Sequence, residues 1–394
     1  MARDTAAMRT AVQAGNRTLA NAKVAKQDEF YTQYDDIQRE VEAYLEYDPD
    51  TFRGKVVYCN CDDPYESNFF KYFAANFNRL GLQRLITTSY DGSPIAGQGV
   101  LFPEYDAENG NRPRPKALAV VIDRVQDEDG DGAVSIADVE VFLRRNHAAR
   151  IPLKGNDKYP GGDFRSPECI EFLKQADIVV TNPPFSLFRE YVAQLIEHGK
   201  KFLIIGNQNA ITYKEIFPLI RENKIWLGVT IHSGDREFRV PDHYPLNAAR
   251  WRIDENGIKY IRVKGVRWFT NLDHGRRHQE LQLMTMADNL RYNKKLRGTM
   301  AYQRYDNYDA IEVPFTEAIP SDYDGAMGVP ITFLDKYNPE QFEILDANEF
   351  RTNPNTPIKP HGLIKDKDSA INGKPTYARI LIRHRRKPAG EATR

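Results

Sequence analysis

The chain has 394 residues, of which 41% are apolar, and it carries 55 basic and 55 acidic side chains. This length exceeds what one hydrophobic core usually needs, so a catalytic domain with a second lobe is expected, while the balanced charge does not by itself indicate a nucleic-acid-binding protein. No run of about 18 apolar residues occurs and the first residues lack a secretion signal, so we expect no membrane span. The odd set of Cys59, Cys61 and Cys169 predicts reduced thiols and a cytoplasmic protein.

The first 27 residues form a basic segment, with five basic side chains against Asp4 alone. Their Ala, Thr and Asn content leaves too little apolar surface to bury, which predicts a flexible arm over residues 1–27. Such an arm either follows phosphates or is a solvated tail.

Residues 28–80 contain the first helix, strand and turn of the chain. Helical periodicity over 28–47 is followed by a strand at 55–60 and by a phenylalanine-rich helix. This order is typical of the first βα turn of a Rossmann-like sheet, where ligands approach the backbone closely. The usual glycine-rich loop is missing, and Asp62 and Asp63 either bind a ligand amine or cap the helix.

Residues 92–162 interrupt the core pattern and contain an acidic, glycine-rich loop. Positions 1, 3, 5, 9 and 12 of this loop are Asp127, Asp129, Asp131, Ser135 and Asp138. The spacing resembles an EF-hand or dockerin-type calcium loop, which offers the six or more oxygens that calcium needs. Position 12 is normally Glu, however, and the segment 117–122 before the loop is predicted to be a strand. A structural calcium site and a solvated acidic loop therefore both stay open.

The stretch 177–188 carries the most information in the chain. Apolar and β-branched residues lead into Asn182, which predicts a short buried strand. Pro183 and Pro184 then end that strand, because neither has a backbone N–H to donate. Ser186 is expected to cap the amphipathic helix that follows.

This corner presents groups that suit a planar ring with an exocyclic amine. The carboxyl end of a parallel strand is where an open α/β sheet binds its ligands. Asn182 offers an amide oxygen, Pro183 a carbonyl and Phe185 a flat apolar face. The alternative interpretation is a proline-stiffened turn with an incidental Asn.

Strand and helix alternate from residue 56 to residue 229, which predicts an α/β fold with a parallel sheet. Beyond residue 229 the pattern becomes β-rich, with a hairpin over 249–263 that combines basic and aromatic residues. Such residues suit phosphate contact and base reading, although a solvated sheet face is the alternative. The DNA-binding candidates are Arg250, Arg252, Arg262, Arg267 and Arg276.

The segment Asn182-Pro183-Pro184-Phe185 after a strand resembles the catalytic motif of amino-group methyltransferases that use S-adenosylmethionine, in the form typical of enzymes acting on adenine N6. Further strings resemble the EcoRI-type adenine-specific DNA methyltransferases and extend this similarity from about residue 28 to about residue 346. They are found at residues 28–34, 57–64, 162–166, 222–229, 305–311 and 327–330.

The resemblance implies a Rossmann-like, S-adenosylmethionine-dependent methyltransferase core with a mixed, mostly parallel sheet over residues 28–229, with an insert at 92–162. It also implies a target-recognition region over 230–346 and a C-terminal segment with a basic tail over 347–394. The implied catalytic residues are Asn182, Pro183, Pro184 and Phe185. The implied cofactor-binding residues are Tyr31, Thr32, Asn60, Asp62, Asp63, Asp163 and Phe164.

The implied activity is site-specific N6-methylation of an adenine flipped out of double-stranded DNA. The enzyme would act in a restriction-modification system or as an orphan or phage modification enzyme. A cognate restriction endonuclease would be a functional pair, not a stable complex. The alternatives are a methyltransferase acting on RNA adenine or on protein glutamine, and a catalytically inactive DNA-binding protein.

Overall fold

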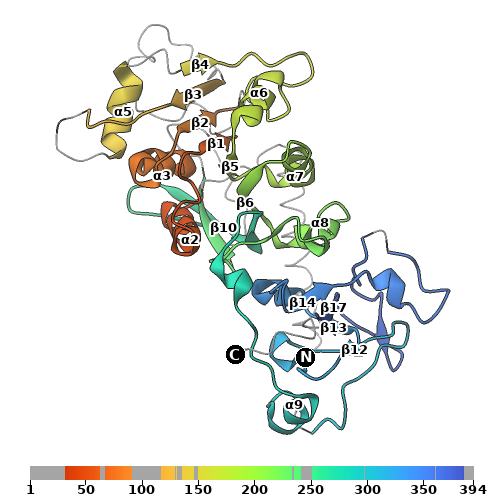
Figure 1. Cartoon of the computed structure of the whole chain (residues 1–394). Helices are drawn as coiled ribbons and strands as arrows, with labels where there is room; N and C mark the ends of the chain where they lie inside the picture. Colours follow the sequence, from red (N-terminus) through yellow and green to blue (C-terminus); the bar gives the residue numbers. More distant parts are fainter. Residues whose placement is uncertain are drawn as a thin grey trace. The chain divides into compact units, whose positions relative to one another are not determined.

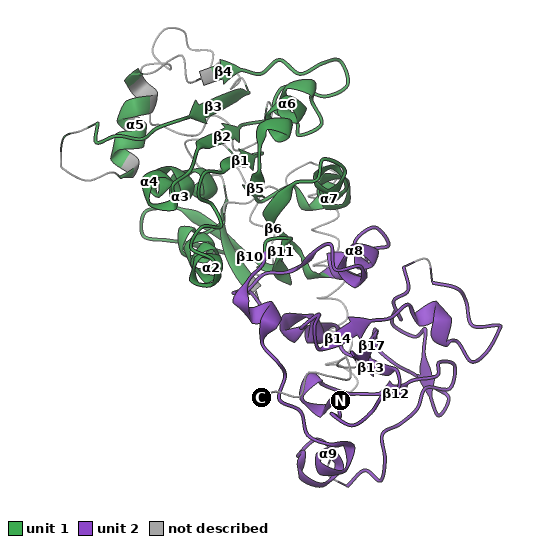
Figure 2. Ribbon diagram, in the orientation of Figure 1, with its two compact units in different colours: residues 1–208, 233–272 green, residues 209–232, 273–394 purple. Residues whose placement is uncertain are grey.

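The computed structural model describes residues 32–62, 67–90, 117–128, 130, 135–145, 150–232, 235–240, 251–296, 298–359 and 361–385. It divides into two compact units: unit 1 comprises residues 1–208 and 233–272, and unit 2 comprises residues 209–232 and 273–394 (Figure 2). The functional boundaries at residues 229 and 346 stay a prediction. Several predicted features lie outside the described residues: the arm over 1–27, Tyr31, Asp63, Asp129, Asp131 and Arg250.

Unit 1 is built on a mixed β-sheet (Figure 1). Its strands lie in the order β4-β3-β2-β1-β5-β6-β11, and the central strands β2, β1, β5 and β6 are parallel. The flanking strands β3, β4 and β11 pair antiparallel with their neighbours. The strands are β1 (Val56–Asn60), β2 (Arg84–Thr88), β3 (Leu118–Ile122), β4 (Arg150–Pro152), β5 (Ile178–Thr181), β6 (Lys201–Asn207) and β11 (Val266–Thr270). The predicted α/β fold with a mixed, mostly parallel sheet is thus confirmed.

Helices cover both faces of this sheet, which explains why the central strands are buried along most of their length. Helices α2, α3 and α5 lie on one side and α6 and α7 on the other (Figure 1). Every residue of β5 is buried. The helices of unit 1 are α2 (Tyr34–Tyr47), α3 (Asn68–Ala75), α4 (Phe77–Leu80), α5 (Ile136–Arg145), α6 (Pro167–Gln175) and α7 (Phe188–Glu197).

Helix α6 begins at a capping serine, whereas α7 does not begin at the serine that the sequence suggests. The side chain of Ser166 accepts a hydrogen bond from the backbone N–H of Cys169 and so caps α6, with Pro167 in the first turn. The predicted cap at Ser186 is wrong. Residues Phe185–Leu187 form a 3₁₀ turn, in which Leu187 N–H donates to the Pro184 carbonyl at 3.0 Å, and α7 begins only at Phe188.

A second, antiparallel sheet in unit 1 contains the predicted hairpin. Its strands are ordered β8-β10-β9 and comprise β8 (Asp235–Val240), β9 (Trp251–Ile253) and β10 (Lys259–Lys264). Ile253 pairs with Lys259 across the hairpin, and the residues that connect β9 to β10 include Gly257 in a left-handed conformation. The predicted change to β structure beyond residue 229 is therefore present in the described residues.

Unit 2 has a smaller sheet ordered β12-β13-β17-β14, with β12 (Ile311–Glu312), β13 (Met327–Val329), β14 (Phe342–Ile344) and β17 (Ile380–His384). Its other regular elements are α8 (Phe217–Arg221), β7 (Trp226–Leu227), α9 (Met286–Tyr292), β15 (Ala370–Ile371) and β16 (Lys374–Pro375). The 3₁₀ turns of the two units are η3 (Phe185–Leu187), η4 (Gln208–Thr212), η5 (Gly275–His278), η6 (Thr316–Ala318), η7 (Ile331–Lys336) and η8 (Ala347–Phe350). Within the described ranges, no helix has the length and apolar character needed to cross a membrane.

A buried polar cluster anchors the unit 2 sheet. The Tyr305 hydroxyl donates to the Glu312 carboxylate, and Nε of Arg379 donates to the same carboxylate at 3.0 Å. Gly328 makes room for this cluster, because a Cβ atom at that position would overlap the Tyr305 ring. The strings around residues 305–311 and 327–330 thus belong to the core of unit 2.

Candidate active site

The proline corner lies at the carboxyl end of β5, as the sequence predicts. Thr181, the last residue of β5, donates its hydroxyl hydrogen to the backbone carbonyl of Asn60 at the end of β1. Asn182 follows directly and is partly buried, with its side-chain oxygen covered. Pro183 is buried and Phe185 is 9% exposed. The corner is therefore fixed to the neighbouring parallel strand.

Helix α7 leaves the corner along a path that requires a glycine on β6. The ring of Phe188 packs on Phe269 with centroids 5.0 Å apart. A Cβ atom on Gly206 would come within 2.5 Å of the Phe188 ring, so only glycine permits this approach. The close contact fixes the first turn of α7 and with it the direction in which the chain leaves Asn182.

The first βα turn replaces the usual glycine with a strained cysteine. Cys61 adopts φ = 62°, a conformation that favours glycine. Asp62, which is 7% exposed, accepts a hydrogen bond from the Ser67 hydroxyl at 2.7 Å, and the Ser67 side chain in turn accepts from Phe69 N–H at the start of α3. A cysteine in the sequence does not indicate a left-handed backbone conformation. From the sequence alone, the turn is therefore recognised only by the absence of the usual glycine-rich loop.

Asn60 connects the ends of two strands. It is 1% exposed, and its side-chain oxygen accepts a hydrogen bond from the Thr88 hydroxyl at 2.9 Å. Because Asn60, Thr88 and Thr181 end the adjacent strands β1, β2 and β5, the polar groups at these ends lie along one edge of the sheet.

Thr32 lies just before α2 and near the same turn. Its carbonyl accepts a hydrogen bond from Asn68 Nδ2 at 2.7 Å, which ties this segment to the beginning of α3. The Thr32 hydroxyl is buried and has no hydrogen-bond partner within the described part of the chain. Buried polar groups are normally paired, so this hydroxyl is a group that a polar ligand would satisfy.

Asp163 and Phe164 lie on a loop against the end of β2. A Cβ atom on Gly162, which has φ = 78°, would overlap the carbonyl of Ser89, so this position requires glycine. The Asp163 carboxylate is 7% exposed and is held by the guanidinium of Arg165 at 2.7 Å. Phe164 is buried, and its carbonyl accepts a hydrogen bond from Gln194 Nε2 at 3.1 Å.

These groups fit S-adenosylmethionine by their chemistry. Carboxylates at Asp62 and Asp163 suit the amino groups of the cofactor, Phe164 offers an apolar ring, and the buried Thr32 hydroxyl lacks a protein partner among the described residues. Sequence reasoning did not single out Tyr191, a fully buried residue of α7 whose hydroxyl contacts the Asn60 side chain at the same edge; the only available signal was its place on the apolar face of that helix.

The basic residues of the predicted DNA-binding surface have different surroundings. Arg252 is exposed, donates to the Glu237 carboxylate at 2.6 Å and lies 4.0 Å above the Tyr260 ring. Arg262 is also exposed and lies 3.8 Å from Glu237. These two arginines share one face of the β8-β10-β9 sheet.

Two further arginines are not surface groups of this kind. Arg267 is 1% exposed within β11, a position that does not support the predicted contact with DNA. Arg276 is partly buried and donates to the Val229 carbonyl at 3.2 Å and to His232. The Arg276 guanidinium is thus engaged in hydrogen bonds within unit 2.

The acidic loop at residues 127–138 gives no support to a calcium site. The buried Asp138 carboxylate accepts backbone N–H groups from Glu128 at 2.7 Å and Ser135 at 2.6 Å, and Asp127 accepts one from Gly130 at 2.6 Å. In the portion that the structure describes, no cluster of His, Cys, Asp or Glu could hold a metal ion. The observed carboxylates therefore organise the loop and the start of α5.

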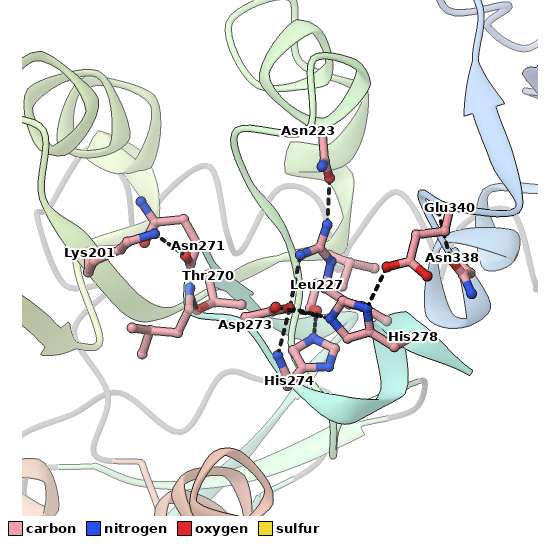
Figure 3. A network of polar contacts seen from close by, with 12 residues as sticks. Lys201, Asn223, Leu227, Thr270, Asn271, Asp273, His274, His278, Asn338 and Glu340 are labelled. Atoms are coloured by element: carbon pink, nitrogen blue, oxygen red, sulfur yellow. Dashed lines mark hydrogen bonds and ion pairs between the residues drawn. The ribbon is translucent and has the colours of Figure 1, made fainter. Parts of the chain in front are cut away.

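A polar network in unit 2 explains the string at residues 222–229 (Figure 3). The guanidinium of Arg277, 7% exposed, lies 3.5 Å above the Trp226 ring and donates to Asn223 at 2.6 Å and Asp273 at 3.2 Å. His278 bridges Asp273 and Glu340, each at 3.0 Å. These contacts indicate a structural role for the string.

Comparison with known proteins gives one consistent result. A model of the family described as "Adenine-specific methyltransferase EcoRI" matches residues 18–385. The type II methyltransferase M.EcoRI of Escherichia coli is 46% identical over 95% of this chain and 98% of its own length. The type II methyltransferase M.MpnI of Mycoplasma pneumoniae is 34% identical over 92% of this chain and 97% of its own length. No solved structure matches significantly. The chain thus belongs to the EcoRI family of adenine-specific methyltransferases.

Proposed function

We propose that this protein transfers a methyl group from S-adenosylmethionine to N6 of an adenine that is flipped out of double-stranded DNA. The observation that carries the proposal is the Asn182-Pro183-Pro184-Phe185 corner, which lies on the same sheet edge as Asn60 and Asp62. The type II methyltransferases at 46% and 34% identity favour DNA over RNA or protein as the substrate.

The corner acts by positioning the target amine. The lone pair of an adenine N6 amine is delocalised into the ring, so the amine is a weak nucleophile. In our proposal the side-chain oxygen of Asn182 and the carbonyl of Pro183 accept its two hydrogens and favour the rehybridised nitrogen, while Phe185 stacks on the base. Stabilisation of the charge that develops on the nitrogen then lowers the barrier, and no general base has to act before attack.

The cofactor supplies an electrophilic methyl group on a sulfonium. We assign its binding to Tyr31, Thr32, Asn60, Asp62, Asp63, Asp163 and Phe164. Of these, Asp62 and Asp163 are already oriented, by Ser67 and Arg165 respectively. This preorganisation would reduce the entropic cost of ordering the site when the cofactor binds.

The β8-β10-β9 sheet is our candidate for contact with duplex DNA, through Arg250, Arg252 and Arg262. Glu237 and Tyr260 hold the Arg252 guanidinium in a defined position, which suits directional contact with a phosphate or a base edge. We further propose a cytoplasmic enzyme that serves a restriction-modification system, with any restriction endonuclease as a functional pair.

Transfer of a tritiated methyl group separates the substrate classes. The full-length protein should label double-stranded DNA in the presence of S-adenosylmethionine, and RNA or protein much less. Preferential labelling of RNA or protein would replace the DNA substrate in our proposal, and labelling of none of them would favour a catalytically inactive DNA-binding protein.

A further inference from the structure

Strands β1 and β5 are neighbours in the unit 1 sheet, but they pair over only part of their length (Figure 1). Among the described residues, this pairing covers only positions 57–58 of β1 and 178–179 of β5. By contrast, β1 pairs with β2 as far as its last residue, Asn60, and β5 pairs with β6 as far as its last residue, Thr181. The carboxyl ends of β1 and β5 therefore lie beyond the pairing that joins these two strands.

The Thr181 side chain continues the connection where the backbone pairing has ended. Thr181 is 0% exposed, and its hydroxyl donates a hydrogen bond to the backbone carbonyl of Asn60 across the two strand ends. Buried hydroxyls keep their partners, because leaving such a group unpaired is costly. This bond therefore limits how far the carboxyl ends of β1 and β5 can move apart.

Each of the two strand ends leads directly into a part of the proposed site. The turn after Asn60, to which we assign the cofactor, is held to β2. The backbone N–H of Asp62 donates to the Thr88 carbonyl at 3.0 Å, and the Thr88 hydroxyl donates to the Asn60 side chain at 2.9 Å. On the other strand, Asn182, to which we assign the target amine, follows Thr181 in the chain. A change in the separation of the strand ends would thus change the separation of methyl donor and acceptor.

We propose that Thr181 is a positioning residue for methyl transfer, whose hydroxyl sets the separation between the cofactor turn and the proline corner. The inference rests on the proposed function. Thr181 acts through Asn60 and Asn182 and does not itself touch the reacting atoms. Because methyl transfer from a sulfonium to an amine needs close alignment of the reacting atoms, loss of this hydrogen bond should slow the chemical step without weakening cofactor binding.

The test compares two substitutions of Thr181 in the full-length protein. Thr181→Val keeps the branched shape of the side chain and removes the donor, whereas Thr181→Ser keeps the donor and removes a buried methyl group. The rate measured is single-turnover methyl transfer to long, unmethylated duplex DNA at saturating S-adenosylmethionine. It should fall about tenfold in Thr181→Val and stay within about twofold of the wild-type rate in Thr181→Ser. Calorimetry should give both variants the wild-type Kd for sinefungin.

Thr270 provides a matched control in the same sheet. It ends β11, is 0% exposed, and its hydroxyl donates to the Phe202 carbonyl on the neighbouring strand β6 at 2.7 Å. Thr270→Val therefore removes the same kind of hydrogen bond, at a strand end to which we assign no part of the site. It should lower the melting temperature about as much as Thr181→Val does, and should leave the rate of methyl transfer within about twofold of the wild-type rate.

The outcomes separate a positioning role from a structural one. A wild-type rate in Thr181→Val would overturn the inference. Equal losses of rate in Thr181→Val and Thr181→Ser, or in Thr181→Val and Thr270→Val, would also overturn it, because the rate would then follow the stability of the sheet. A raised Kd for sinefungin with an unchanged rate at saturating cofactor would do the same. If the wild-type protein transfers no methyl group to DNA, the proposed function itself fails, and that failure is distinguishable from all of these.

Discussion

Buried polar groups are arranged differently in the two units. In unit 2 several of them pair with one another, Arg379 with Glu312 and Arg277 with Asn223, although the buried Tyr308 hydroxyl has no partner among the described residues. At the carboxyl edge of the unit 1 sheet, the buried hydroxyl of Thr32 has no partner among the described residues. A closed network stabilises a fold, whereas incompletely paired groups at a sheet edge are suited to a ligand. The comparison predicts that substitutions in unit 1 and unit 2 affect different quantities.

The largest effect is expected at the proline corner. Asn182→Ala should reduce kcat by about 10²–10³-fold or more, because it removes an acceptor that acts in the transition state. Cofactor affinity and melting temperature should change little. Single-turnover methylation, calorimetry and thermal unfolding measure the three quantities, and turnover near the wild-type value would rule out the assigned role of Asn182.

The next effect is on stability and lies in unit 2. Glu312→Gln should lower the free energy of unfolding by about 3 kcal/mol, since it leaves the buried Arg379 without a countercharge. Cofactor affinity should stay at its wild-type value. Urea unfolding gives the energy, with Glu317→Gln as the control, because the exposed pair of Glu317 with Lys336 should contribute less than about 1 kcal/mol. Equal effects of the two substitutions would contradict the importance of the buried network.

A smaller effect is expected on DNA binding. Arg252→Gln should weaken binding to duplex DNA about tenfold and reduce the slope of log K against log salt by about 1, if the arginine neutralises one phosphate. Fluorescence anisotropy over a salt series measures both quantities. The exposed Arg304, which pairs with Asp309 in unit 2, is a control position for loss of one positive charge. An unchanged salt slope in Arg252→Gln would count against a DNA-facing β8-β10-β9 sheet.

The smallest effect concerns two histidines of unit 2: His278 of the network, and the buried His274, whose Nε2 lies 3.1 Å from the Leu227 carbonyl oxygen. Burial lowers the pKa of His274 to about 4. Partial desolvation also opposes the charge on His278, but its hydrogen bonds to Asp273 and Glu340 outweigh this and raise its pKa above the ordinary value. Between about pH 6.5 and about pH 4 the unfolded chain therefore binds a proton at His274 that the folded chain does not bind. The free energy of unfolding should fall as pH decreases through this interval.

His278 should have the opposite dependence. Its contribution to stability is complete below the unfolded pKa of about 6.5 and is lost as pH rises through the higher pKa of the folded state. NMR titration of labelled histidines measures both groups. The His278 signal should titrate above the usual pH range and the His274 signal should be constant at neutral pH; the reverse order would show that the network is paired differently.

Much of unit 1 was predictable because its signals are local. The apolar run before Asn182, the two prolines and the Ser166-Pro167 cap each determine backbone structure within a few residues. The start of α7 was not predictable, since the 3₁₀ turn depends on how Phe188 packs on Gly206 of β6. The left-handed Cys61 has no residue-type signal, so tertiary contacts have to maintain it.

Side-chain burial was the least predictable property. Arg267 and Arg276 fit a basic surface by composition, but the fold buries the first and engages the second in unit 2. The calcium-like spacing also gave a signal that the described residues do not support, because backbone amides bind the carboxylates of Asp127 and Asp138. The spacing of acidic residues shows which carboxylate oxygens a loop could offer to a metal ion. Only the fold shows that backbone N–H groups already donate to those oxygens.

Nucleoside analysis of the reaction product tests the central claim most directly. Duplex DNA is incubated with S-adenosylmethionine and either the wild-type protein or Asn182→Ala, and is then digested and separated by chromatography with mass detection. We predict N6-methyldeoxyadenosine from the wild-type protein and almost none from the variant. Methylation on another base or atom, or equal N6-methylation by both proteins, would contradict the account.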